Sequence, residues 1–267
     1  EHFGESPLLY GKTEGSTPFR LSLHVGDVGH CLVVGPTGAG KSVLLALMAL
    51  QFRRYEGNQI FAFDYGGSIR AAALAMGGDW QDLGGALYDA SSDGSVALQP
   101  LARIDEAAER AWASEWLAAL LAGEGVAVDP AAKEHIWSAL TSLATAPVSE
   151  RTLTGLAVLL QSQELKLALS PYLVGGPWGR LLDAEAEHLG SARVQALETE
   201  GLVGASSAAT VLSYLFHRIE GRLDGSPTLI IIDEGWLVLD SPAFAAQLRE
   251  WLKTLRKKNA SVIFATQ

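Results

Sequence analysis

The sequence predicts an α/β fold, in which helices flank a mostly parallel central sheet and one segment forms an all-helical insertion. Short apolar runs of strand length alternate with segments of helical periodicity. That alternation implies parallel strands joined by right-handed crossover connections. In addition, a glycine-rich loop at residues 35–42 lies between an apolar run and a helical segment, which is the setting of phosphate-binding loops.

The composition is that of a globular chain with a large core. Its 267 residues are 48% hydrophobic, enough for one large domain or for a domain with a sizeable insertion. No apolar run approaches the roughly 18 residues that cross a bilayer. The formal charge of −10 disfavours a surface wrapped broadly by nucleic acid or pressed on an anionic membrane, although it is compatible with a local basic pore.

The single cysteine, Cys31, lies in an apolar run, so we expect it to be a small buried residue. With one cysteine, an intrachain disulfide is excluded. The chain starts at Glu1 without an initiator Met and stops directly after a predicted strand. We therefore expect it to be a piece of a larger protein.

Residues 1–28 are expected to form a lead-in or edge hairpin, because the alternating segment 19–25 is typical of an antiparallel strand. Residues 29–104 form the first part of the predicted core. This part contains a central strand at 30–34, the phosphate loop, a helix at 43–52, a buried strand at 59–64, a helix from Ser68 to Met76, and a stretch at 79–100 that is rich in turn signals.

Residues 105–175 are predicted to be the helical insertion, with helix-period segments at 105–122, 130–145 and 152–169. Trp112 and Trp116 lie one helical turn apart, and Trp137 falls on the apolar side of the next segment. A base-stacking platform is one interpretation, and a packed helix interface is the favoured one. His135 is isolated, so we do not expect a metal site there.

Residues 176–267 complete the predicted core. They contain a strand at 193–198, a helix at 205–223, a strand at 228–232, a helix at 242–258 and a last strand at 260–267.

The glycine-rich loop is a complete G-x-x-x-x-G-K-S motif. Its glycines let backbone N–H groups close around a polyphosphate. Lys41 is expected to reach the terminal phosphates, and the Ser42 hydroxyl to bind Mg²⁺, at the positive end of the following helix. The predicted ATP site consists of Gly35, Pro36, Thr37, Gly38, Ala39, Gly40, Lys41, Ser42 and Val43. The alternative is a simple glycine-rich turn before a helix.

Asp233 and Glu234 follow a run of four apolar residues. A buried strand there places both carboxylates at its carboxyl end, where ligands bind in open α/β sheets. Asp233 is expected to hold Mg²⁺, and Glu234 to orient and deprotonate an attacking water. This pairing favours ATP hydrolysis over phosphoryl transfer to a metabolite. The alternative is a buried strand that merely ends in acids before a turn.

Gln267 is the third predicted catalytic residue, beside Lys41 and Glu234. If the strand 260–267 lies next to the strand 228–232, Gln267 can hydrogen-bond the attacking water or the γ-phosphate. A frayed chain end is the alternative. The basic run 256–258 is interpreted as a favourable, solvated helix end, and a phosphate contact by Arg256 is the weaker hypothesis.

These motifs together resemble the TrbE-like conjugative transfer ATPases of type IV secretion systems, which belong to the large VirB-class ATPase family. The resemblance rests on the loop 35–42, the run 61–64, the sequence Asp-Glu-Gly-Trp at 233–236, and the stretch 251–267. The loop is common to many NTPases, whereas Leu-Lys-Thr-Leu-Arg-Lys-Lys-Asn-Ala leading into Ala-Thr-Gln is much more specific. The match runs from about Gly29 to Gln267 and extends more distantly to the hexameric DNA-pumping ATPases of the FtsK and HerA group.

The resemblance implies a RecA-like P-loop NTPase, the C-terminal motor domain of a larger protein. That protein is expected in the bacterial cytoplasm, peripheral at the inner membrane, where it powers pilus assembly or substrate transport. Such ATPases look like homo-oligomeric rings, with a hexamer expected, in which an arginine from the neighbouring subunit completes each ATP site. The implied partners are ATP, other type IV secretion components and DNA.

Two alternative functions stay open at this point. One is a nucleotide-gated assembly scaffold with little turnover, which the acidic surface favours. The other is a motor that translocates DNA directly, for which Lys253, Arg256, Lys257 and Lys258 form the dense basic cluster.

Overall fold

The computed structural model describes residues 7–23, 29–85, 96–202, 207–234 and 242–266. The chain divides into two compact units. We call them the sheet unit, which comprises Glu1–Gln81, Gly190–Val203 and His217–Gln267, and the helical unit, which comprises Asp82–Leu189 and Gly204–Phe216. The helical unit is larger than the helical insertion predicted at 105–175, because it takes in flanking residues on both sides and a second chain segment.

The sheet unit contains a six-stranded sheet with the order β3-β8-β7-β4-β6-β5. Its strands are β3 (Cys31–Val34), β4 (Gln59–Asp64), β5 (Asp79–Asp82), β6 (Val194–Glu198), β7 (Thr228–Ile232) and β8 (Ala260–Thr266). The pairs β3/β8, β8/β7, β7/β4 and β4/β6 are all parallel. The predicted α/β fold with a mostly parallel sheet is therefore confirmed.

One strand departs from the sequence-based expectation by its existence. β5 lies in the stretch 79–100, which was predicted to be rich in turns. Its sequence, Asp-Trp-Gln-Asp, has neither an apolar run nor an alternation strong enough to predict a strand.

β3 was predicted to be a central strand, and this prediction is wrong for the described residues, where β3 lies at the edge of the sheet beside β8. Leu32 and Val34 are each 63% exposed, whereas Val33 packs against the core. Cys31 is half-buried rather than buried. Partial burial still raises the pKa of its thiol, which disfavours the reactive thiolate.

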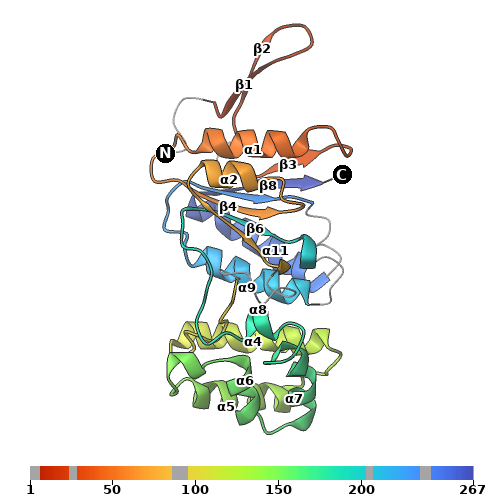
Figure 1. Ribbon diagram of the computed structural model, residues 1–267, viewed down its shortest axis with the longest axis vertical. Helices are drawn as coiled ribbons and strands as arrows, with labels where there is room; N and C mark the ends of the chain where they lie inside the picture. Colours follow the sequence, from red (N-terminus) through yellow and green to blue (C-terminus); the bar gives the residue numbers. More distant parts are fainter. Residues whose placement is uncertain (1–6, 24–28, 86–95, 203–206, 235–241, 267) are drawn as a thin grey trace. The chain divides into compact units, whose positions relative to one another are not determined.

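One face of the sheet carries the main hydrophobic core of this unit. The helices α1 (Lys41–Phe52) and α2 (Arg70–Ala75) lie on that face, and α11 (Pro242–Leu255) lies on the other (Figure 1). The core joins residues from α1 and α2 to alternate residues of the strands, and these include Leu45, Met48, Phe52, Ala73, Ile60, Ala62, Leu229, Ile231, Ile263 and Ala265. The strand residues have the period of two that a pleated sheet imposes.

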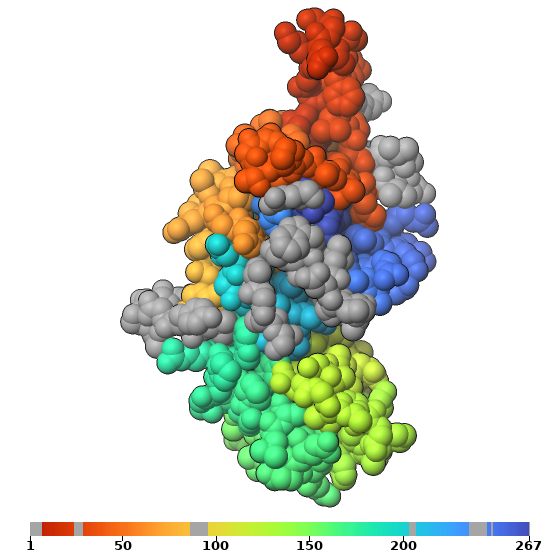
Figure 2. Space-filling view, turned by 90° about the vertical axis from the view of Figure 1, so that its right-hand side faces the viewer, coloured from red at the N-terminus to blue at the C-terminus, as the bar shows by residue number. Residues whose placement is uncertain are grey.

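A small antiparallel hairpin precedes the sheet. It consists of β1 (Leu9–Lys12) and β2 (Pro18–Leu21), and it projects beyond α1 (Figures 1 and 2). Leu9 and Leu21 face one another and pack against the core. The predicted edge hairpin is thus observed, although its second strand ends before the predicted residue 25.

The helical unit contains most of the remaining helices. They are α4 (Ala107–Gly123), α5 (Pro130–Leu143), α6 (Leu153–Leu159), α7 (Gln163–Leu169) and α8 (Gly179–Leu182), while α9 (Ala208–Glu220) begins in this unit and ends in the sheet unit. Short 3₁₀ turns occur at Val148–Glu150, Ser170–Tyr172, Glu200–Leu202 and Arg256–Lys258. Asp129 caps α5 by accepting a hydrogen bond from the backbone N–H of Ala132 at 2.7 Å.

The segment 152–169 was predicted as one helix-period segment, and the structure divides it in two. Leu160 has an extended backbone and ends α6, and the Ser162 side chain then caps α7. A serine that can cap a new helix competes with continuation of the old one.

The tryptophans of α4 pack within the helical unit, as the favoured interpretation predicted. Trp112 and Trp116 are stacked with ring centroids 5.8 Å apart, and Tyr214 on α9 contacts both rings. Trp116 is buried, and its indole N–H donates to the Thr210 carbonyl at 3.0 Å. Trp137 is 39% exposed, and the Arg110 guanidinium lies 5.5 Å from its ring.

No helix among the described residues is long and apolar enough to cross a membrane.

Candidate functional site

The phosphate-binding loop connects β3 to α1. Gly38 has φ 79° and Gly40 has φ 87°, so both adopt the left-handed conformation that favours glycine. Gly40 is also the N-cap residue of α1. Gly35 lies outside the left-handed region, and a Cβ there would make only ordinary contacts, the nearest at 3.6 Å to Ala39. The backbone therefore requires glycine at two of the three predicted positions.

Lys41 closes this loop. Its Nζ donates to the carbonyl of Gly35 at 2.7 Å and to that of Pro36 at 3.3 Å. The residues from Pro36 to Gly40 are exposed, and the first turn of α1 carries no acidic residue. The positive end of the helix thus lies next to an accessible loop that holds one lysine, an arrangement that suits a polyphosphate.

The loop and the two predicted carboxylates lie at the same edge of the sheet. The carboxyl ends of parallel strands share one edge, and β8 separates β3 from β7. The backbone N–H of Gly35 donates to the Thr266 carbonyl at 3.3 Å, which ties the loop to the end of β8. Asp233 directly follows β7, and its N–H donates to the carbonyl of Phe63 on β4 at 3.0 Å. The predicted neighbourhood of the strands β7 and β8 is confirmed.

The Asp233 carboxylate is buried and has neutral donors. Its Oδ2 accepts from the Ser68 hydroxyl at 2.9 Å, and its Oδ1 accepts from the Glu234 N–H at 3.1 Å. Burial raises the pKa of Asp233, and the nearby charges of Glu234 and Asp64 act in the same direction, whereas the two hydrogen bonds oppose the shift. An anion placed in such surroundings gains stability from a cation. These donors and this burial fit a magnesium ligand, and the Ser42 hydroxyl at the start of α1 is a second oxygen of the kind that Mg²⁺ prefers.

Glu234 has an unusual backbone conformation. Its φ is 48°, in the left-handed region that non-glycine residues seldom occupy. Strain of this kind occurs often at functional sites. Its carboxylate is half-buried beside Asp233, which fits a group that must reach a water molecule.

Sequence reasoning assigned no role to two further carboxylates at this edge. Asp64 ends β4 and is fully buried, and Glu198 ends β6. Asp64 accepts from the Ser68 hydroxyl, from the Ile69 N–H at 3.0 Å and from the Trp80 indole at 3.2 Å. The available signal was the same as for Asp233, since each of these acids ends a strand-like apolar run.

Glu198 binds the glycine turn that follows β4. Its carboxylate accepts from the N–H of Gly66 at 3.1 Å, from that of Gly67 and from that of Glu200 at 2.9 Å. Burial raises the pKa of Glu198, although these hydrogen bonds favour its charged form.

Some predicted positions lie outside the described residues or take no part in the site. Gln267 lies outside them, as do Gly235 and Trp236. Among the basic residues of the cluster, Lys258 pairs with Glu220 at 3.3 Å, and Lys253 pairs with Glu250 at 2.6 Å. Within the part of the chain that the structure describes, no cluster of three or more metal-ligating side chains occurs.

A parallel sheet with this loop, followed two strands away by paired carboxylates, defines the P-loop NTPase class with a RecA-like α/β fold. The chain matches no family model. It is 48% identical to a probable conjugal transfer protein TrbE of Sinorhizobium fredii, over 98% of this chain and 39% of that protein. It is 46% identical to the conjugal transfer protein TrbE of Rhizobium radiobacter, over 98% of this chain and 32% of that protein.

More distant relatives agree. The type IV secretion system protein virB4 of Bartonella henselae is 27% identical over 96% of this chain and 32% of that protein. A solved structure of VirB4 from Thermoanaerobacter pseudethanolicus superposes with a TM-score of 0.75, covers 100% of this chain and 78% of that one, and shares 18% of its residues, which supports the fold. The chain is TrbE-like and is related to the TrbE and VirB4 proteins, as the sequence motifs predicted. It spans 39% of the length of the first of these relatives.

Proposed function

We propose that this chain is the ATPase motor domain of a conjugative transfer or type IV secretion machine. It hydrolyses ATP to power pilus assembly or substrate transport. The observation that carries the proposal is the common sheet edge at which the loop 35–42 and the pair Asp233–Glu234 lie, in a chain 48% identical to a conjugal transfer protein.

Each predicted residue has a chemical task in this proposal. The backbone of residues 35–43 cradles the phosphates of ATP, and Lys41 exchanges its bonds to the loop carbonyls for bonds to the terminal phosphates. Ser42 and Asp233 hold Mg²⁺, which when bound neutralises charge on the phosphate oxygens. Glu234 orients the attacking water and accepts its proton. Gln267 contacts that water or the γ-phosphate.

The proposed assembly follows from the same relatives. The protein acts as a homo-oligomeric ring, with a hexamer expected, and an arginine of the neighbouring subunit completes each ATP site. Its location is the bacterial cytoplasm, peripheral at the inner membrane, together with other type IV secretion components. Direct DNA translocation is less favoured, because Lys253 and Lys258, two members of the basic cluster, already pair with glutamates.

The Glu234→Gln variant tests the proposed reaction. Glutamine keeps the size and polarity of the side chain but cannot accept a proton, so we expect Mg-ATP binding to persist while turnover falls on the order of a hundredfold or more. Steady-state hydrolysis and nucleotide binding are measured on the full-length protein in its oligomeric form. Unchanged turnover by this variant would overturn the assignment of Glu234. A wild-type oligomer that binds ATP but scarcely hydrolyses it would instead favour the nucleotide-gated scaffold.

A further inference from the structure

Ser68 lies between two carboxylates that come from neighbouring strands. We propose that Ser68 is a positioning residue that holds Asp233 in the orientation needed for metal binding, and that β6 holds Ser68 through Glu198. The inference rests on the proposed function, because it concerns the same magnesium site. It adds a residue and a strand to which the phosphate-loop motifs assign no role.

The distances place the serine hydroxyl equally close to both acids. Its Oγ lies 2.8 Å from Oδ1 of Asp64 and 2.9 Å from Oδ2 of Asp233. A hydroxyl carries one proton and therefore donates to one carboxylate at a time. The side chain of Ser68 is thus a donor for which Asp64 and Asp233 compete.

The two acids depend on this donor to different degrees. Asp64 has two further donors, the Ile69 N–H at 3.0 Å and the Trp80 indole N–H at 3.2 Å, so its orientation persists without Ser68. For Asp233 the other donor is the N–H of the next residue, Glu234, at 3.1 Å. The Ser68 hydroxyl is therefore the contact that fixes Asp233 from a different part of the chain.

The position of Ser68 is itself set by a third strand. The preceding glycines, Gly66 with φ 68° and Gly67 with φ 66°, form a left-handed turn whose N–H groups point at the Glu198 carboxylate. This carboxylate ends β6, which pairs with β4 in parallel. Residues of β6, of the turn after β4 and of the end of β7 are thus linked in sequence by hydrogen bonds and by the short turn, and this linkage ends at Asp233.

The expected consequence is an effect on metal affinity. Groups that orient a metal ligand through hydrogen bonds typically change metal affinity or activity by about 10–100-fold when they are removed. Ser68→Ala removes the hydroxyl and should weaken metal binding to that extent. Ser68→Thr keeps the hydroxyl and should restore most of the affinity. Nucleotide binding without a metal should be the same in all three proteins, because Ser68 does not belong to the loop 35–43.

The test uses Mn²⁺ as a probe for the magnesium site. Its affinity is measured by electron paramagnetic resonance on the full-length protein in the presence of a nonhydrolysable ATP analogue. Ser261→Ala is the matched control, because Ser261 is a buried serine at the opposite end of β8. If Ser68→Ala does not fold, Ser68→Cys carries the same prediction, since a thiol is a weak hydrogen-bond donor.

The outcomes separate this inference from the proposed ATPase activity. A loss of Mn²⁺ affinity of about 10-fold or more in Ser68→Ala, with recovery in Ser68→Thr and no change in Ser261→Ala, supports the inference. Equal affinities in Ser68→Ala and the wild type overturn it, even if the wild type hydrolyses ATP rapidly. A wild type that binds the Mn²⁺–nucleotide complex in a Ser68-dependent way but does not turn over ATP overturns the ATPase proposal alone.

Discussion

At the scale of single residues, Glu234 combines chemical promise with a conformational cost. Its left-handed backbone, with φ 48°, is of the kind that costs a non-glycine residue roughly 1–2 kcal/mol. Glycine would avoid that cost, as it does at Gly38 and Gly40 in the phosphate loop. A glutamate at such a position is explained by what its carboxylate does, and not by its contribution to stability.

A comparison of glycine and alanine at position 234 tests this explanation. Both variants lose the carboxylate, so both should lose hydrolysis. Glu234→Gly should be more stable than Glu234→Ala by roughly 1 kcal/mol, because alanine retains the steric clash of the left-handed conformation. Urea unfolding of the two variants gives the difference. An alanine variant as stable as the glycine variant would contradict the backbone conformation described for Glu234.

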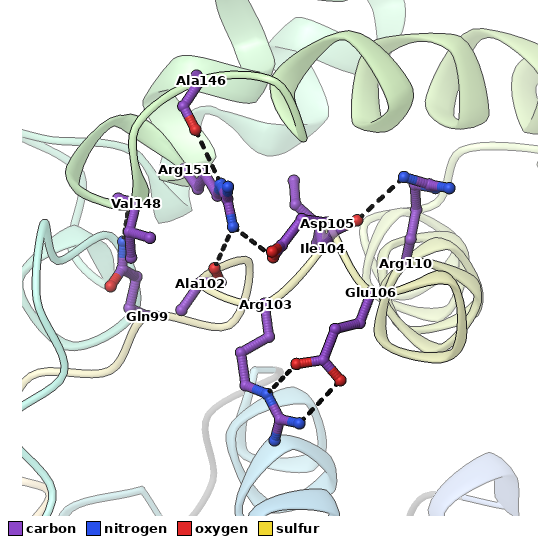
Figure 3. A network of polar contacts seen from close by, with 10 residues as sticks. All are labelled: Gln99, Ala102, Arg103, Ile104, Asp105, Glu106, Arg110, Ala146, Val148 and Arg151. Carbon is purple, nitrogen blue, oxygen red and sulfur yellow. Dashed lines mark hydrogen bonds and ion pairs between the residues drawn. The ribbon is translucent and has the colours of Figure 1, made fainter.

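At the scale of elements, a buried arginine joins two segments of the helical unit (Figure 3). The Arg151 side chain donates to the Ala146 carbonyl at 3.0 Å, to the Ala102 carbonyl at 2.9 Å and to the Asp105 carboxylate. It thereby connects the turn after α5 to the segment that precedes α4. Gln99 makes a parallel connection, donating to the Val148 carbonyl at 2.6 Å. Arg151 is 9% exposed, so these contacts are largely shielded from water.

Arg151→Met should destabilise the helical unit by about 2–3 kcal/mol, because it leaves two backbone carbonyls and a carboxylate without their donor. The estimate is modest because Asp105 is itself half exposed and can turn to water. Arg103→Met is the matched control. Arg103 pairs with Glu106 at 3.0 Å, but both side chains are more than half exposed, so its loss should cost less than about 1 kcal/mol. Similar losses for the two variants in urea unfolding would refute the proposed importance of Arg151.

At the scale of the whole molecule, the predicted nucleotide ligands all belong to the sheet unit. The loop 35–43, Asp233 and Glu234 lie within its chain segments, whereas the helical unit contributes none of the predicted ligands. A ligand that binds only the folded form of a protein stabilises it by mass action. Nucleotide binding should therefore stabilise one unit more than the other.

A nonhydrolysable ATP analogue with Mg²⁺ should slow amide hydrogen exchange in the sheet unit. At a ligand concentration of about 100 times Kd, the stabilisation is about 2.7 kcal/mol. Lys41→Ala should abolish the effect, because it removes the side chain expected to bind the terminal phosphates. Hydrogen exchange with mass spectrometry resolves the two units. Slowed exchange confined to the helical unit, or no slowing at all, would contradict the predicted site.

Much of the fold could be predicted because its signals are local. The strands at 59–64 and 228–232 have the predicted bounds, since uninterrupted apolar runs next to turn residues specify buried strands. The misses have equally local causes. β5 has a polar sequence, and the division between α6 and α7 depends on whether a serine caps a new helix or continues the old one.

The candidate site divides in the same way. A phosphate loop, a strand ending in Asp233–Glu234 and the α/β class follow from the spacing of residue types along the chain, because that chemistry requires those residues in that order. The edge position of β3, the neighbourhood of β7 and β4, and the meeting of Asp64, Asp233 and Glu198 around one turn come only from the tertiary structure. The physical reason is that strand order depends on how distant segments pack together, and periodicity within one strand carries no information about its neighbour.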